Sequence, residues 1–107
     1  MKKLFLSDYE VEIEIDGKKV KKPFQVKESI LEILFHPDLK LAGRELLKQN
    51  ELALKIEKCN EDFILLENEE HNKILRALEL TTGLGRNAVE FVKRIIEAQN
   101  VEVKEKH

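Results

Sequence analysis

Residues 9–24 read YEVEIEIDGKKVKKPF, and this stretch decides the fold of the N-terminal part of the chain. From Tyr9 to Ile15 apolar residues alternate with glutamates, a period of two that predicts a half-buried β-strand. Asp16-Gly17 follows, and this dipeptide is the strongest short signal for a two-residue turn. The sequence therefore predicts an antiparallel β-hairpin.

The turn also predicts the register of this hairpin. The expected pairs are Ile13 with Val20 and Tyr9 with Phe24 on an apolar face, and Glu12 with Lys21 and Glu14 with Lys19 on a polar face. One register thus gathers the apolar side chains and places opposite charges across from each other. Because Pro23 has no N–H to donate, the second strand is expected at a sheet edge.

Helical patterns follow the hairpin. Ser29 is expected to cap a short buried helix that Pro37 closes, and Asp38 to cap a longer helix that runs to about Cys59. Gly43 is a weak point in that second helix. The alternative interpretation takes Leu52, Leu54 and Ile56 as a strand that returns into residues 63–66, and periodicity leaves both open. In the helical interpretation residues 63–66 form a short extended segment.

Two further helices complete the pattern. Asn68 is a good cap for a third helix, which is expected to bury Ile74, Leu75, Ala77 and Leu78. The last helix has an apolar face and ends near Asn100; that face carries Ala88, Val89, Phe91, Val92, Ile95 and Ile96. Val101 and Val103 either add a brief strand beside the hairpin or fray with the charged tail at 104–107.

These elements predict an α+β fold in which an N-terminal antiparallel β-hairpin, in a two- or three-stranded sheet, packs against three or four helices. With 107 residues, 42% of them apolar and 37% charged, the chain is expected to form one domain over residues 1–107. Its only cysteine, Cys59, allows no intrachain disulfide, which favours a reducing, cytoplasmic location. No apolar run approaches the roughly 20 residues of a membrane span, and the short run after Lys3 is too brief for a signal peptide.

Candidate residues for chemistry are scattered. His36, Cys59, His71 and His107 have separations that match no zinc pattern, and His71 falls on the apolar side of its helix. The only serines, Ser7 and Ser29, lie outside any glycine-flanked elbow. Residues 82–85 lack the Lys-Ser/Thr ending of a nucleotide-binding loop. We therefore expect no enzyme activity, catalytic residue, metal, cofactor or small-molecule substrate.

One helix face is basic. Helical spacing places Lys40, Arg44, Lys48, Glu51, Lys55 and Lys58 in a narrow polar stripe. Five positive side chains on one face are able to contact successive phosphates of a nucleic acid. Residues 61–70 carry five carboxylates and no lysine or arginine, so they can instead lie against the stripe and neutralise it.

Residues 80–92 resemble the helix-hairpin-helix motif of DNA-binding proteins. Gly83, Leu84 and Gly85 match the glycine, apolar residue and glycine that join the two helices of that motif. Thr82 stands where the family commonly has proline, and Val89 where it usually has alanine. The resemblance implies phosphate contacts from backbone N–H groups between Gly83 and Asn87, with help from Arg86.

The whole layout resembles small accessory proteins of phages and prophages, whose members are mostly of undefined function and are thought to act through protein contacts. That resemblance rests on the order of a hairpin, a buried helix, a basic helix, an acidic step at residues 65–70 and a closing helix. We expect a non-enzymatic binding or assembly module with a protein partner or self-association, through the hairpin edge near Pro23 or the Ile95-Ile96 side of the last helix. The alternative is nucleic-acid binding without sequence preference.

Overall fold

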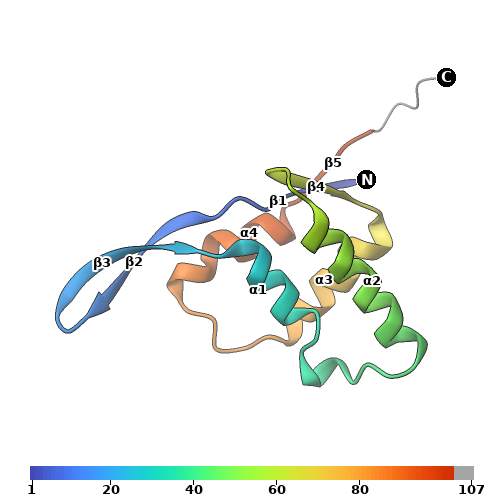
Figure 1. Cartoon of the computed structure of the whole chain (residues 1–107), viewed down its shortest axis with the longest axis horizontal. Helices are drawn as coiled ribbons and strands as arrows, with labels where there is room; N and C mark the ends of the chain where they lie inside the picture. The colour runs from blue at the N-terminus through green and yellow to red at the C-terminus, as the bar shows by residue number, and fades with distance from the viewer. Residues whose placement is uncertain (103–107) are drawn as a thin grey trace.

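The chain folds with helices and two small antiparallel sheets in the computed structural model, which describes residues 1–102 (Figure 1). The order of elements is β1 (Lys2–Phe5), β2 (Tyr9–Ile15), β3 (Lys18–Phe24), α1 (Val26–Ile33), the 3-10 helix η1 (Pro37–Leu39), α2 (Arg44–Lys58), β4 (Phe63–Leu66), α3 (Asn68–Leu80), the 3-10 helix η2 (Arg86–Ala88), α4 (Val89–Ile96) and β5 (Gln99–Asn100). The α+β class predicted from the sequence is confirmed.

The hairpin has the predicted register. Strands β2 and β3 pair Ile13 with Val20 and Tyr9 with Phe24, and they pair Glu12 with Lys21 and Glu14 with Lys19. Both turn residues have positive φ, 51° at Asp16 and 78° at Gly17, as a two-residue turn that matches the strand twist requires. The turn therefore determines which residues meet across the hairpin.

The prediction of one sheet is wrong in one respect, because the hairpin stands alone and a second sheet has the order β4-β1-β5. Strand β1 comes from the short apolar run at the N-terminus and pairs Leu4 with Ile64 in β4. Strand β5 pairs with β1 and not with the hairpin. Val103 and the tail 104–107 lie outside the described residues. The sequence of β1, KKLF, has no alternation of apolar and polar residues and is only four residues long, so periodicity does not identify this strand.

Helix α1 begins earlier than predicted, at Val26. The Val26 N–H donates to the Asp8 carboxylate at 3.1 Å, so the segment between β1 and β2 supplies the acceptor that Gln25 does not provide. Ser29 is therefore not the cap: it lies inside the helix, where its hydroxyl donates to the Gln25 carbonyl at 2.7 Å. The helix ends before Pro37, as predicted.

Helix α2, in contrast, starts later than predicted, at Arg44 and not directly after Asp38. Residues 37–39 form the 3-10 turn η1, Lys40 adopts a left-handed conformation, and Gly43 has a φ of 54°. Within α2, Leu52 and Ile56 are buried while Leu54 is exposed. A strand would point all three to one face, so the helical interpretation of residues 52–58 is correct, and residues 63–66 are extended as predicted.

Helices α3 and α4 differ from prediction mainly at their ends. The N-cap of α3 is Glu67, not Asn68, and its backbone N–H donates to Glu70 Oε1 at 2.8 Å in a capping box. Helix α4 ends at Ile96, four residues before the expected Asn100, because the chain then joins β5. Ile74, Ala77 and Leu78 are buried, and Leu75 is half-buried.

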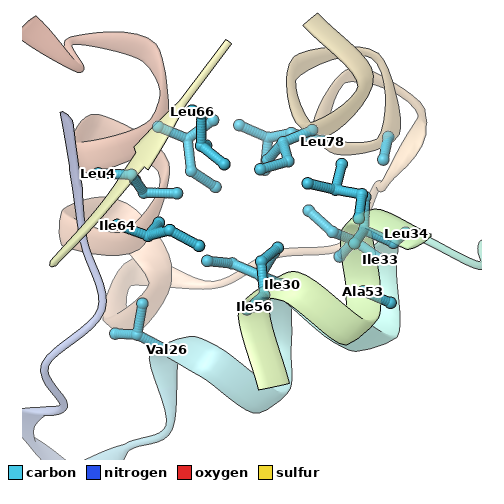
Figure 2. Packing of buried hydrophobic residues seen from close by; sticks show 14 of the residues in the cluster. Leu4, Val26, Ile30, Ile33, Leu34, Ala53, Ile56, Ile64, Leu66 and Leu78 are labelled. Carbon is cyan, nitrogen blue, oxygen red and sulfur yellow. The ribbon is translucent and has the colours of Figure 1, made fainter. Parts of the chain in front are cut away.

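The hydrophobic core lies between the β4-β1-β5 sheet and the helices. Figure 2 shows Leu4, Ile64 and Leu66 of this sheet directed toward side chains of α1, α2 and α3. Phe91 and Ile95 of α4 complete the cluster. Within residues 1–102, no helix is both long and apolar enough to cross a membrane.

Candidate interaction site

The segment between α3 and α4 is the stretch that resembles a helix-hairpin-helix turn. Gly83 has a φ of 78°, which favours glycine, whereas Gly85 has a φ of −90°, which any residue adopts. A Cβ at Gly85 would meet no atom within 4 Å. Leu84 and Arg86 are exposed. The turn thus needs its first glycine for its own backbone, and the second is not needed for internal packing.

Asn87 in this turn is held by the hairpin. Its side-chain Nδ2 donates to the Glu12 carbonyl at 3.1 Å, and its backbone carbonyl accepts from the Tyr9 hydroxyl at 2.7 Å. The Phe91 N–H donates to the same hydroxyl at 3.1 Å. Asn87 is therefore a structural link between the hairpin and α4, a role that sequence reasoning did not foresee.

Among the residues that link the hairpin to α4, Tyr9 has a shifted pKa. Burial raises the pKa of Tyr9 above its ordinary value of 10.0, and this outweighs the lowering by the Phe91 N–H and by Arg94. The Arg94 guanidinium carbon lies 5.1 Å from the centre of the Tyr9 ring. The phenol is thus held in its neutral, hydrogen-bonding form.

The basic stripe is shorter and more neutral than its sequence suggests. Arg44, Lys48, Lys55 and Lys58 lie on α2, but Lys40 lies outside that helix. Lys55 Nζ is 2.8 Å from Glu70 Oε1, so the acidic segment lies against the stripe. The first turn of α3 and the stripe together line a hollow of about 490 Å³ that carries both signs of charge.

The stripe and the turn do not form one surface. Figure 1 shows α2 on one side of α1 and the segment between α3 and α4 on the other, next to the hairpin. The residues proposed from the sequence for phosphate contact therefore fall into two separate groups. Arg86 belongs to one group, and Lys48 and Lys58 belong to the other.

An apolar groove lies along α4. It has a volume of about 410 Å³ and is lined by Leu84, Gly85, Ala88, Val89, Val92, Lys93, Ile96 and Glu97. Val89 and Ile96 are each 60% exposed and Leu84 is 43% exposed. An adjoining hollow of about 230 Å³ shares Leu84, Val92 and Ile96 and extends to Leu75 and Leu78 of α3. Together they form the α3/α4 groove.

The charges around the α3/α4 groove nearly balance. Lys93 and Glu97 lie one turn apart on α4 with their charged groups 4.0 Å from each other, and Glu79 lies at the α3 side. Pairs this exposed contribute little to stability. The α3/α4 groove therefore offers mainly apolar surface and little net charge.

Sequence reasoning located this surface only in part. The Ile95-Ile96 side was expected as an interaction surface, whereas Val89 and Val92 were assigned only to the apolar face of the last helix. In the structure Ala88, Phe91 and Ile95 are buried, while Val89 is exposed and Val92 half-buried. The signal was present in the pattern, because the six apolar residues of α4 cover a wider arc than one packed face occupies.

His36, Cys59 and His71, for which the sequence predicted no catalytic role, each contact a backbone group. His71 is buried, and its Nε2 lies 2.7 Å from the Ile95 carbonyl oxygen, which it can contact only as an N–H donor. His36 Nδ1 accepts from the Asp38 N–H at 3.1 Å, and the half-buried Cys59 thiol lies 3.3 Å from the Phe63 carbonyl oxygen. In residues 1–102 no three His, Cys, Asp or Glu side chains come together as metal ligands.

We compared the chain with protein families, curated proteins and solved structures. No protein-family model, no curated protein and no solved structure matches this chain.

Proposed function

We propose that this chain is a non-enzymatic binding module that engages a protein partner through the α3/α4 groove. The observation that carries the proposal is the exposure of Val89, Ile96 and Leu84 side by side in one groove. Scattered exposed apolar residues are ordinary on protein surfaces, whereas a contiguous apolar hollow with a polar rim is typical of an interaction site.

The shape of the groove favours a helical ligand. Val89, Val92 and Ile96 lie at helical spacing along α4, and Leu75 and Leu78 of α3 line the adjoining hollow. The backbone N–H and C=O groups of a helix are bonded within that helix, so α3 and α4 contact a ligand through side chains and not through a free strand edge. An amphipathic helix that lays its apolar face between two helices fits such a groove.

Nucleic-acid binding through residues 83–87 has less support. Asn87 is engaged by the hairpin, Lys55 is paired with Glu70, and the two basic groups lie on separate parts of the molecule. The net charge of −2 supplies no long-range attraction for a polyanion.

The experiment is a selection of helical peptides from a displayed library against the purified chain. We expect ligands whose apolar anchors recur at i, i+3 or i+4 and i+7, and we expect Ile96→Asp to weaken their binding at least about tenfold, because a buried unpaired carboxylate is costly. Leu47→Asp is the matched control, since Leu47 is an equally exposed apolar residue on α2.

Isothermal titration calorimetry with the selected peptides measures both variants. Equal binding to Ile96→Asp and to the unaltered chain, or loss of binding with Leu47→Asp instead, would show that the α3/α4 groove is not the binding surface. If the groove instead joins two copies of this chain, sedimentation shows a dimer that Ile96→Asp dissociates, and the partner in the proposal is replaced by the chain itself.

A further inference from the structure

The distal part of the hairpin projects away from the helices. Figure 1 shows the turn between β2 and β3 far from α1 and α4, which lie near the other end of the hairpin. At that base Tyr9 stacks on Phe24 with ring centres 4.9 Å apart, and Phe24 lies 5.4 Å from Phe91. Beyond them the apolar face is only partly covered, and Ile15 at its end is 42% exposed. An isolated two-stranded ribbon of this kind is marginally stable, and a third strand stabilises it.

The register identifies which backbone groups face outward. A two-residue turn is closed by a hydrogen-bonded pair, here Ile15 with Lys18, and hydrogen-bonded pairs then alternate with non-bonded pairs. Lys19, Lys21 and Pro23 therefore direct their backbone groups away from β2. The Glu12 carbonyl belongs to the corresponding outward set of β2, which agrees with its hydrogen bond from Asn87.

The two edges of the hairpin differ in access. Asn87 occupies the β2 edge at Glu12, with η2 beside it. Within residues 1–102 no strand pairs with the outer side of β3, and its only strand partner is β2. Lys19 and Lys21 consequently offer N–H and C=O groups to a further strand, and Pro23 limits this free edge at the end near the core, because it has no N–H.

The charges determine what kind of strand fits this edge. Strand β3 carries four exposed lysines, Lys18, Lys19, Lys21 and Lys22, and no acidic residue. Pairing of two β3 edges from two copies would set lysines opposite lysines, which is destabilising. Pairing of β3 with the acidic β2 of another copy is hindered, because Asn87 covers β2. The edge is thus protected against self-association but open to an acidic strand.

We infer that the β3 edge binds an extended segment of a protein partner in which acidic and apolar residues alternate. The acidic side chains would lie beside Lys19 and Lys21 on the polar face, and the apolar ones beside Val20 on the apolar face. The inference rests on the proposed function, binding of a protein partner, and adds a second surface to the α3/α4 groove.

The test uses a synthetic peptide with the sequence of residues 9–15, YEVEIEI, because β2 itself shows that this pattern pairs with β3. A second peptide has each glutamate replaced by lysine, and it tests the role of charge on the unaltered protein. Both are titrated into isotopically labelled protein at low salt and followed by NMR. We expect the acidic peptide to shift the Lys19 and Lys21 amide signals and to bind at least tenfold more tightly than the basic one, with an affinity that falls as salt is added.

Variants separate this edge from the rest of the surface. Lys19→Gln/Lys21→Gln should weaken peptide binding several-fold, whereas Lys48→Gln/Lys58→Gln, which removes the same charge from α2, should not. Ile96→Asp should bind the peptide as the unaltered chain does, so failure of the groove and failure of the edge are distinguishable. Signal shifts centred on α4, equal binding of the two peptides, or no shift at millimolar peptide would overturn the inference.

Discussion

Tyr9 shows how one side chain joins two elements that are far apart in sequence. In a continuous α-helix the Phe91 N–H would bond directly to the Asn87 carbonyl, four residues earlier. Here the Tyr9 hydroxyl stands between them, donating to the carbonyl and accepting from the N–H. Ala88, the N-cap of α4, makes no side-chain hydrogen bond, so the hydroxyl from β2 acts as the cap of this helix.

We expect Tyr9→Phe to lower the free energy of unfolding by about 1–2 kcal/mol at pH 7, because both backbone groups lose their partner. Urea unfolding followed by circular dichroism measures the change. Ser29→Ala removes a hydroxyl whose bond is local and exposed, and it should change stability by less than about 0.5 kcal/mol. Equal stability of Tyr9→Phe and the unaltered chain would mean that α4 closes the gap by a direct bond.

The raised pKa of Tyr9 sets the pH range of this contribution. Since the folded state holds the phenolic proton more tightly than the unfolded state, the contribution is fully present below about pH 10 and is lost as pH rises through the folded pKa. Tyr9 is the only tyrosine, so absorbance of the phenolate reports this one group.

At the scale of elements, the hairpin is the part whose local sequence specifies its geometry most fully. Its turn places Asp16 and Gly17 at positive φ, and the alternation of β2 then fixes which face is apolar. The helices depend more on their surroundings. Helix α1 begins at Val26 because Asp8 accepts a hydrogen bond there, and α2 begins only after the backbone reverses at Lys40 and Gly43.

We expect Gly17→Ala to destabilise the hairpin by about 1–2 kcal/mol, since a Cβ disfavours the left-handed conformation. No atom lies within 4 Å of the added Cβ, so the cost comes from the backbone alone. Amide hydrogen exchange at Ile13 and Val20 measures this local opening and should become about 5- to 30-fold faster. Gly85→Ala is the control. Because Gly85 has a negative φ and no atom within 4 Å of an added Cβ, this change should leave amide exchange at Ile13 and Val20 unchanged.

At the scale of the whole molecule, one core joins the β4-β1-β5 sheet to the four helices (Figure 2). Apolar residues on the same helix therefore differ greatly in their effect on stability. On α2, Leu52 is 3% exposed and contacts the core, whereas Leu47 is 65% exposed.

We expect Leu52→Ala to lower the free energy of unfolding by about 2–5 kcal/mol, because it removes buried apolar contacts and leaves a cavity. Leu47→Ala, the same change on the same helix, should stay within about 0.5 kcal/mol of the unaltered chain. Thermal and urea unfolding of the two variants checks this. Similar losses in both would contradict the placement of α2, and a strand over residues 52–56 would instead make Leu54→Ala as costly as Leu52→Ala.

The sequence by itself determined the features that depend on neighbours along the chain. Hairpin register, the edge position of β3 and the extended residues 63–66 were predictable, because turn chemistry and alternation act over short separations. The contact of the acidic segment with Lys55 was only one of two alternatives, because it joins two helices. The Ile95-Ile96 side of the last helix was predicted as an exposed apolar surface, which is right for Ile96 and wrong for Ile95, because Ile95 is buried in the core.

Features that depend on partners distant in the sequence arise only when the elements pack together. Strand β1 exists because Leu4 meets Ile64 across the sheet, and helix starts depend on acceptors such as Asp8 in other elements. Val89 is exposed because α3 and α4 contact each other through their core-facing side chains, and one helix buries only part of a wide apolar arc. Helical periodicity predicts how wide that arc is, but only packing against other elements decides which part of it stays exposed.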